Sequence, residues 1–128
     1  MAKMLVIYQR PDDVPAFERH YYETHIPMAK RLPGLRSYEV SFGPIMSPAS
    51  PSDAWLIGTL HFDSLAAILE AFASDVGAEC AADRRNYAPD PSKFQISCST
   101  TSTSDQQRRR ELRQRFSSAV ATRFSGQT

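Results

Sequence analysis

Apolar and polar positions along residues 1–98 predict strands and helices in the order β-α-β-β-α-β. Residues 3–9 form a short apolar run typical of a strand, and residues 36–42 alternate between apolar and polar side chains. Residues 54–62 are largely apolar on both faces, and residues 93–98 alternate again. We therefore expect four strands, with one helix after the first strand and another after the third.

The first predicted helix begins after Asp12 and Asp13, either of which can cap it. Apolar residues then recur at the helical period of about 3.6 positions. The expected stripe contains Val14, Phe17, Tyr21, His25 and Met28. Because Pro27 has no backbone N–H, we expect the helix to break or kink near residues 23–26, with Pro33 and Gly34 stopping the segment.

The second predicted helix is capped by Asp63 or Ser64 and keeps an apolar register through residue 72. We expect Val76 and Gly77 to interrupt it. A short helical piece over residues 78–85 then leads into a proline-containing loop.

This order of elements predicts the ferredoxin-like α+β fold, a βαββαβ sandwich in which both helices cover one face of a four-stranded antiparallel sheet. The first strand offers apolar side chains on both faces, with Leu5 and Ile7 opposite Met4, Val6 and Tyr8. A sheet with two apolar faces and helices for only one would leave a large exposed apolar patch. We therefore expect a homodimer in which a second copy covers the open face, with the C-terminal tail as the alternative cover.

The tail differs in charge from the rest of the chain. Residues 1–104 carry 9 Lys and Arg against 12 Asp and Glu, whereas residues 105–128 carry 6 Arg against 2 acidic residues. We expect residues 1–98 to form the domain and residues 99–128 a polar linker plus a basic amphipathic helix over 106–124. The apolar stripe of that helix contains Leu112, Phe116, Ala119, Val120 and Phe124. Since no aromatics interleave the arginines, packing on the domain or on a dimer partner is favoured over nucleic acid or lipid.

Other composition features narrow the class of protein. Cys80 and Cys98 match no metal spacing and no signal peptide is visible, so we expect reduced cysteines and a cytoplasmic protein. No apolar run approaches the ~20 residues of a membrane span. The chain has no glycine-rich phosphate loop, dinucleotide fingerprint or serine elbow, and its three histidines lack zinc-ligand spacing. We expect no metal and no cofactor, although a haem would need only one axial histidine.

His25 is the first candidate for chemistry. It lies on the apolar side of the first helix, near the break expected at Pro27 and one turn after Tyr21. A histidine there can act as a general acid or base, or it can cap the carbonyls freed at the break. His20 is expected at the flank of the helix, in solvent.

Further candidates lie on the helix and on the sheet. Tyr21 can orient a ligand oxygen, and His61 follows Trp55 and Thr59 on one face of the third strand, which would face a barrel interior. The predicted catalytic residues are therefore His25, Tyr21 and His61. The predicted ligand-binding residues are Tyr8, Phe17, Tyr38, Trp55 and Thr59. Core or interface packing explains the aromatics equally well, and a strand-end histidine in water explains His61.

Two runs of residues resemble the EthD family, which is named for a protein in ethyl tert-butyl ether degradation clusters. They are Phe17-x-x-His20-Tyr21-x-x-x-His25-x-Pro27-x-Ala29 followed by Leu32-Pro33-Gly34-Leu35, and Phe62-Asp63-Ser64-Leu65 with Asn86-Tyr87. The resemblance covers residues 3–98 and implies a ferredoxin-like subunit whose dimer closes an α/β barrel. Relatives of that architecture include cofactor-free monooxygenases, muconolactone isomerases, polyketide cyclases and haem-using enzymes, so the fold does not choose the reaction.

The resemblance and the candidate residues together suggest two functions. In the first, the dimer is an enzyme of catabolism that binds a small apolar oxygenated or aromatic molecule. His25 then moves a proton during a monooxygenase-like oxidation, a cyclisation or an isomerisation. In the second, the protein is a non-catalytic binding or accessory protein of a degradation pathway.

Overall fold

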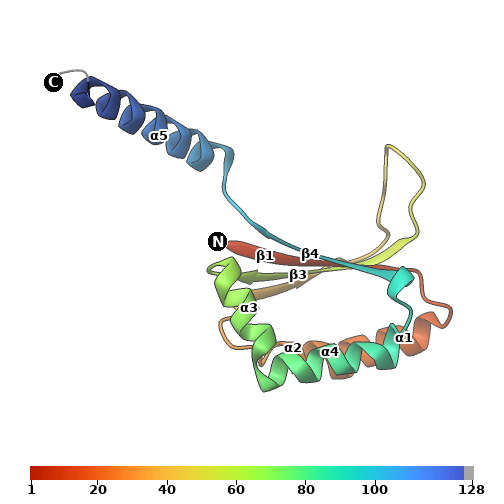
Figure 1. Ribbon diagram of the computed structural model, residues 1–128. Coiled ribbons are helices and arrows are strands. Elements are labelled where there is room, and N and C mark those ends of the chain that lie inside the picture. The colour runs from red at the N-terminus through yellow and green to blue at the C-terminus, as the bar shows by residue number, and fades with distance from the viewer. Residues whose placement is uncertain (126–128) are drawn as a thin grey trace.

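The computed structural model describes residues 1–125, with side chains through residue 118. Its centre is a four-stranded antiparallel sheet in the order β2-β3-β1-β4, with helices on one face (Figure 1). The strands are β1 (Ala2–Gln9), β2 (Ser37–Val40), β3 (Ala54–Phe62) and β4 (Phe94–Thr100). The predicted ferredoxin-like α+β fold is confirmed.

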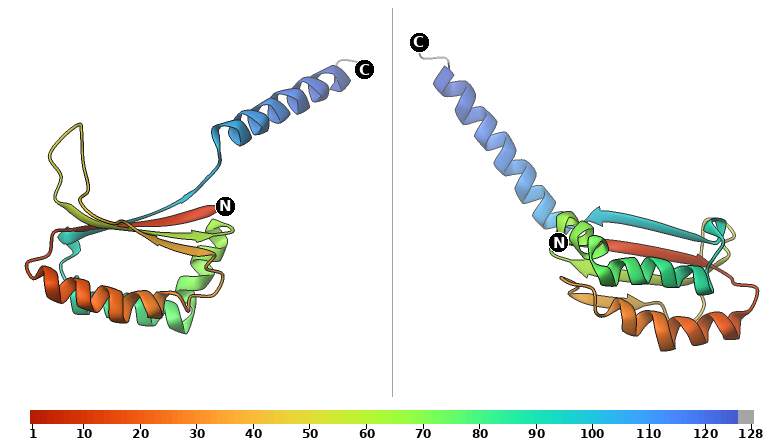
Figure 2. Two further views of the ribbon diagram at one scale, coloured as in Figure 1. Left: turned by 180° about the vertical axis from the view of Figure 1, so that it is seen from behind. Right: turned by 60° about the horizontal axis from the view of Figure 1, so that its bottom comes forward.

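The helices form a single layer against that face, as two further views show (Figure 2). This layer consists of α1 (Val14–His20), the π-helical turn η1 (Tyr21–His25), α2 (Ile26–Ala29), α3 (Leu65–Ala73) and α4 (Asp75–Tyr87). The 3₁₀ turn η2 (Pro91–Lys93) precedes β4, and α5 (Ser104–Ser125) follows β4 and stands away from the layer. Over the described residues, no helix is both long enough and apolar enough to cross a bilayer.

Of the break or kink expected near Pro27, a break is wrong, because the helical segment continues to Ala29. Instead, the backbone widens into η1 just before Pro27, and the N–H of Ile26 reaches back five residues to the carbonyl of Tyr21. Pro27 supplies no N–H and its ring would crowd the carbonyl of Glu23 in a regular helix. A π turn relieves that crowding while the helix axis continues.

The second helix breaks earlier than expected, at Ser74 rather than at Val76 and Gly77. The hydroxyl of Ser74 accepts a hydrogen bond from the Gly77 N–H and thereby caps α4. Gly77 lies inside α4, where an added Cβ would come within 2.5 Å of the Ala71 carbonyl oxygen. Glycine is therefore used here for close backbone approach rather than for a helix break.

Alternation along the strands separates the two faces of the sheet. Met4, Val6 and Tyr8 of β1 are buried beneath the helices, whereas Leu5 and Ile7 face the other way and are half-buried. The covered face is completed by Leu56, Leu60 and Phe62 of β3 and by Phe17, Tyr21, Ile68 and Ala71 of the helices. Each large side chain of this set stabilises the fold by about 1.5–3 kcal/mol on burial.

The opposite face of the sheet has no cover in the single chain. The side chains that line it are half-buried and include Lys3, Leu5, Ile7, Ile57, Thr59 and His61. The loop over residues 41–53 and helix α5 both project on this side, at opposite ends of the sheet (Figures 1 and 2). Helix α5 leaves its own domain, so 54% of Leu112 and 74% of Phe116 are exposed. The side chains of Ala119, Val120 and Phe124 lie outside the described residues.

Gly58 leaves room for the side chains of Tyr21 on η1 and Tyr38 on β2 to meet over the sheet. The hydroxyls of Tyr21 and Tyr38 share a hydrogen bond of 2.6 Å, and a Cβ at Gly58 would lie 2.9 Å from the Tyr21 oxygen. We expect Gly58→Ala to lower the free energy of unfolding by about 1–3 kcal/mol through overpacking. The measurement is urea unfolding.

The matched test of this clash is the double variant Gly58→Ala/Tyr21→Phe, which removes the crowded oxygen. Its loss of unfolding free energy should be smaller than the sum of the two single losses. Additive losses would contradict the assigned clash.

Candidate functional site

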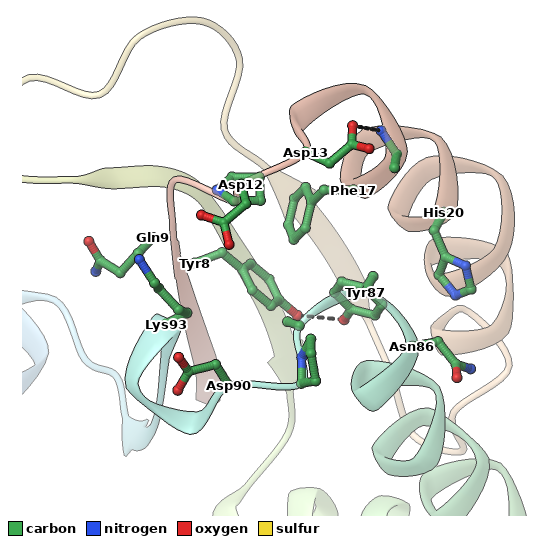
Figure 3. Close-up of a pocket in the computed structure, with 14 residues that line it drawn as sticks. Tyr8, Gln9, Asp12, Asp13, Phe17, His20, Asn86, Tyr87, Asp90 and Lys93 are labelled. Carbon is green, nitrogen blue, oxygen red and sulfur yellow. Dashed lines mark hydrogen bonds between the residues drawn. The ribbon is translucent and has the colours of Figure 1, made fainter.

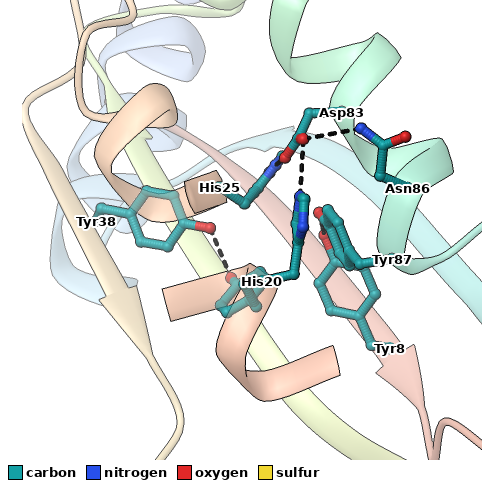
Figure 4. A network of polar contacts seen from close by, with 8 residues as sticks. Tyr8, His20, His25, Tyr38, Asp83, Asn86 and Tyr87 are labelled. Atoms are coloured by element: carbon teal, nitrogen blue, oxygen red, sulfur yellow. Dashed lines mark hydrogen bonds and ion pairs between the residues drawn. The ribbon is translucent and has the colours of Figure 1, made fainter. Parts of the chain in front are cut away.

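A buried carboxylate joins the two histidines of the first helical segment. Asp83 of α4 lies 2.8 Å from Nε2 of His20 through Oδ1, and 2.9 Å from Nδ1 of His25 through Oδ2 (Figure 4). The amide of Asn86 donates a third hydrogen bond to Oδ1 at 3.2 Å. Asp83 and His25 are each 6% exposed. This Asp83 cluster, formed by Asp83, His20, His25 and Asn86, is the main polar group inside the helix layer.

The π turn explains why both histidines reach one carboxylate. Residues five positions apart differ by about 140° around a regular α-helix, so His20 would lie at the flank if His25 faced inward. In η1 the hydrogen bond spans five residues, which brings positions five apart nearly into line. The expectation that His20 is solvated is therefore wrong: its side chain is 29% exposed and bound to Asp83.

Two tyrosine pairs surround the cluster. The hydroxyls of Tyr8 and Tyr87 share a hydrogen bond of 2.7 Å, as those of Tyr21 and Tyr38 do at 2.6 Å. The ring of Tyr87 stacks on His20 at 5.5 Å and meets the edge of His25 at 4.8 Å between centroids. Such ring packing adds about 0.5–1.5 kcal/mol per pair and holds the imidazoles in place.

Burial and hydrogen bonding set the charge state of the site. Burial alone would raise the pKa of Asp83, but the hydrogen bonds from His20, His25 and Asn86 outweigh it and hold that pKa below its usual value. Burial lowers the pKa of His25 despite its contact with Asp83. At neutral pH, an ionised Asp83 accepts the Nδ1–H of a neutral His25, whose Nε2 then stays unprotonated.

The tyrosines remain protonated hydrogen-bonding groups. Burial raises the pKa of Tyr8, and of Tyr21 and Tyr87 still further. It also raises the pKa of Tyr38. These phenols therefore position neighbouring groups by hydrogen bonding and do not supply phenolate near neutral pH.

A cleft of about 470 Å³ opens beside His20, where the end of β1 meets the start of α1 and the end of α4 (Figure 3). Tyr8, Phe17, His20 and Tyr87 lie along its inner wall, and Asp12, Asp13, Asp90 and Lys93 lie around it. This volume suits a small organic molecule. Of the Asp83 cluster, His20 and Asn86 line the cleft, whereas Asp83 and His25 do not.

His25 lines a different and much smaller space. This inner cavity measures about 20 Å³ and is bounded by His25, Tyr38, Cys80 and Arg84 among others. A space of that size holds about one water molecule. Of the two histidines, His20 therefore lies at the cleft, whereas His25 lies behind Asp83.

Comparison with known proteins supports the family resemblance. The model of the EthD domain matches residues 11–91. This chain belongs to the EthD family. An uncharacterized 11.0 kDa protein from the thcB-thcC intergenic region of Rhodococcus erythropolis is 31% identical over 88 residues, which cover 69% of this chain and 84% of that protein.

Solved structures share the fold of this EthD family protein. The crystal structure of an EthD family protein from Bacillus halodurans C-125 has a TM-score of 0.71 at 26% identity, covering 80% of this chain and 99% of that one. A dimeric ferredoxin-like protein of unknown function from Bacteroides fragilis has a TM-score of 0.53 at 15% identity, covering 78% and 95%. SnoaB, a cofactor-independent oxygenase from Streptomyces nogalater, has a TM-score of 0.56 at 13% identity, covering 80% and 94%. The last two likenesses show the fold alone.

The structure divides the predicted site residues between the two faces of the sheet. His25, Tyr21, Tyr8, Phe17 and Tyr38 lie together beneath the helices. His61 and Thr59 lie on the open face, where Nε2 of His61 is 3.3 Å from a Glu39 carboxylate oxygen but without hydrogen-bond geometry. Trp55 lies at a register shift of β3, packs against the core and donates its Nε1–H to a carboxylate oxygen of Glu18 on α1 at 3.3 Å. Within one chain, the sheet therefore separates His61 from His25. In the described part of the chain, no three His, Cys, Asp or Glu side chains are grouped to hold a metal ion.

Sequence reasoning missed Asp83 and gave no role to His20 in this EthD family protein. One signal was available on α4, where Cys80, Asp83 and Tyr87 follow the helical spacing of a buried stripe. A carboxylate within such a stripe needs partners, because an unpaired buried charge is costly. Its partners could not be deduced without knowing which face α4 turns toward α1.

The lowered pKa of His25 predicts acid sensitivity. In the unfolded chain a histidine takes up a proton near pH 6.5, whereas folded His25 resists protonation. The unfolded state then binds more protons, so the free energy of unfolding falls as the pH drops below about 6.5. The corresponding loss through Asp83 begins only below its unfolded value near 3.8. We expect His25→Gln, which keeps a hydrogen-bond donor, to flatten the decline between pH 7 and pH 5.

Urea unfolding at half-unit pH steps measures this decline for both proteins. A variant whose profile keeps the wild-type slope would show that His25 does not carry the effect.

Proposed function

We propose that this EthD family protein binds a small apolar oxygenated or aromatic molecule in the cleft and moves a proton on it with the Asp83 cluster. One observation supports this most directly: Asp83 is buried and holds His20 at the wall of a cleft of about 470 Å³. An imidazole that donates one N–H to a carboxylate keeps its second nitrogen as a base. His20 takes the role of ligand contact that the sequence suggested for His25.

The proposed chemistry is a reversible proton transfer. His20 removes a proton from an O–H or an activated C–H of the ligand, and the imidazolium that forms is stabilised by Asp83 at 2.8 Å. His25 and Asn86 hold the carboxylate from its other sides, so it stays oriented during the transfer. The proton then returns to the product. This step serves a cyclisation or isomerisation, and it also serves an oxidation if O₂ is the second substrate.

A non-catalytic binding protein is the second candidate. At the cleft, the hydroxyls of Tyr8 and Tyr87 are hydrogen-bonded to each other. Aromatic walls with satisfied polar groups suit retention of an apolar ligand as well as its conversion. Affinity without turnover across a panel of aromatic and ether-derived compounds would favour this role.

The test of catalysis is the variant His20→Gln. For a compound that the wild-type protein converts, we expect turnover to fall about 10²–10⁴-fold, which is the usual contribution of a general acid or base. Turnover is measured by loss of substrate, with parallel recording of O₂ consumption to separate oxidation from isomerisation. The neighbouring Arg19→Gln is the matched control, because Arg19 is exposed and does not line the cleft.

Two outcomes would assign the reaction to a residue other than His20. Loss of turnover in His25→Gln with full activity in His20→Gln would assign the proton transfer to His25 instead of His20. Loss in His61→Gln alone would place the reaction on the open face of the sheet.

We also propose that the protein is a homodimer in which a second copy covers the open face. Leu5, Ile7 and Ile57 form an apolar surface there, flanked by Thr59 and His61. Burial of this surface gains about 25 cal/mol per Å². The Bacteroides fragilis protein of the same fold is dimeric, which supports the same arrangement.

The dimer predicts a solution mass of twice 14.3 kDa by light scattering. We expect Ile57→Glu to raise the dimer dissociation constant at least about 100-fold, because each copy would bury a charge in the apolar interface. The matched control is Leu69→Glu, since Leu69 is an exposed leucine on α3 in the helix layer. A single-chain mass for the wild-type protein at micromolar concentration would contradict the dimer.

A further inference from the structure

We propose that helix α5 of one copy docks on a pocket beneath the β2–β3 loop of its dimer partner, so that the two tails clasp the dimer. The proposal rests on the proposed sheet-to-sheet homodimer and adds an interface to it. The occupant is the basic amphipathic tail of a second copy of this chain. Three independent features support it: the surface of the pocket, the surface of α5 and the placement of both on the sheet.

The loop pocket has a volume of about 750 Å³ and an apolar lining. Its apolar and aromatic members are Tyr22, Phe42, Pro44, Ile45 and Trp55. Phe42 is fully exposed, and Met46 at the tip of the same loop is 88% exposed. Side chains of this size are rarely left in solvent unless a partner covers them.

Helix α5 has a matching apolar strip. Leu112 and Phe116 are four residues apart and therefore lie one above the other on one side of the helix. At about 100° per residue, Arg108 and Arg115 border this strip on one side and Arg109 and Arg113 on the other. The strip is too narrow to hold α5 on its own, but it fits a partner with an apolar centre and acidic surroundings.

The charges of the two surfaces are complementary. The loop pocket contains Glu18 and Asp53 against the single basic side chain of Arg10, which lies over the ring of Trp55 at 5.3 Å. Residues 1–104 carry 9 basic against 12 acidic side chains, whereas residues 105–128 carry 6 against 2. Arginines beside a partly covered carboxylate form stronger pairs than exposed lysines do.

The placement of the two features fits a two-fold dimer. The loop and α5 project toward the open side of the sheet from its opposite ends, in both views (Figures 1 and 2). If a two-fold axis perpendicular to the strands places the second sheet on the first, the end of β4 in one copy lies over the loop end of the other. Each α5 then starts at the β4 edge of the sheet, roughly 10–14 Å across from the β2–β3 edge that carries the loop, and at about 33 Å it is long enough to reach the loop pocket of its partner.

The clasp is a property of this chain beyond its family domain. The EthD domain match ends at residue 91, and the Bacillus halodurans structure is covered to 99% by only 80% of this chain. Helix α5 begins at Ser104, outside the matched domain.

Cross-linking between two different single-cysteine variants tests the clasp in the full chain. In a Cys98→Ser background, one copy carries Ser47→Cys on the loop and the other carries Ser117→Cys beside Phe116; Cys80 is buried and is kept. After mixing and subunit exchange, a short bismaleimide should join the two variants. The control pairs Ser117→Cys with Ala66→Cys, an exposed position on α3, and should give no product.

A second measurement uses the apolar strip of α5. We expect Phe116→Ser to raise the dimer dissociation constant at least about tenfold, since a two-fold dimer loses the contact twice. Gln114→Ser lies about 200° away on the helix and should leave the constant unchanged. Raising the salt from 0.1 M to 1 M should weaken the wild-type dimer, because it screens the arginine contacts.

The outcomes separate the clasp from the sheet dimer. A dimer that shows no loop-to-tail product, or that is unaffected by Phe116→Ser, would overturn the clasp and leave the sheet dimer standing. A monomeric wild-type protein would overturn both. A product formed only within one chain of a Ser47→Cys/Ser117→Cys double variant would show that the tail covers its own sheet instead.

Discussion

The helix layer depends on one buried carboxylate and the three side chains that satisfy it. Asp83 is 6% exposed, and an unpaired charge at that depth would cost several kcal/mol. His20, His25 and Asn86 surround it, so α4 and the first helical segment are joined by charge-assisted hydrogen bonds as well as by packing. Displacement of one helix along the other would break the hydrogen bonds of the carboxylate to His20 and His25 and leave only that from Asn86 on its own helix.

The same contact makes a backbone irregularity useful. A π turn is slightly less favourable than a regular helix, and such turns are frequent at functional sites. Here it accommodates Pro27 and aligns His20 with His25, so a steric requirement and a chemical one are met by a single local change. The histidines then differ in exposure: one reaches the cleft while the other stays behind the carboxylate.

The two faces of the sheet carry different groups of side chains. The helix-covered face carries the Asp83 cluster, the tyrosine pairs and the cleft. The open face carries half-buried apolar side chains, with the loop and α5 projecting at its two ends. Association through the open face would leave the cleft accessible, because the cleft lies on the other side of the sheet. Binding chemistry and assembly can therefore vary independently in this fold.

The sequence by itself determined the order of elements, the fold class and the family, because strand alternation, helical periodicity and the spacing of His25, Pro27 and Gly34 are local properties. It also indicated that one sheet face lacks a cover. Only the tertiary structure decided which candidates meet, since the contact of His20 with Asp83 joins residues 63 positions apart. That contact depends on the π turn. The regular helical period of the sequence does not predict the five-residue hydrogen bond of this turn.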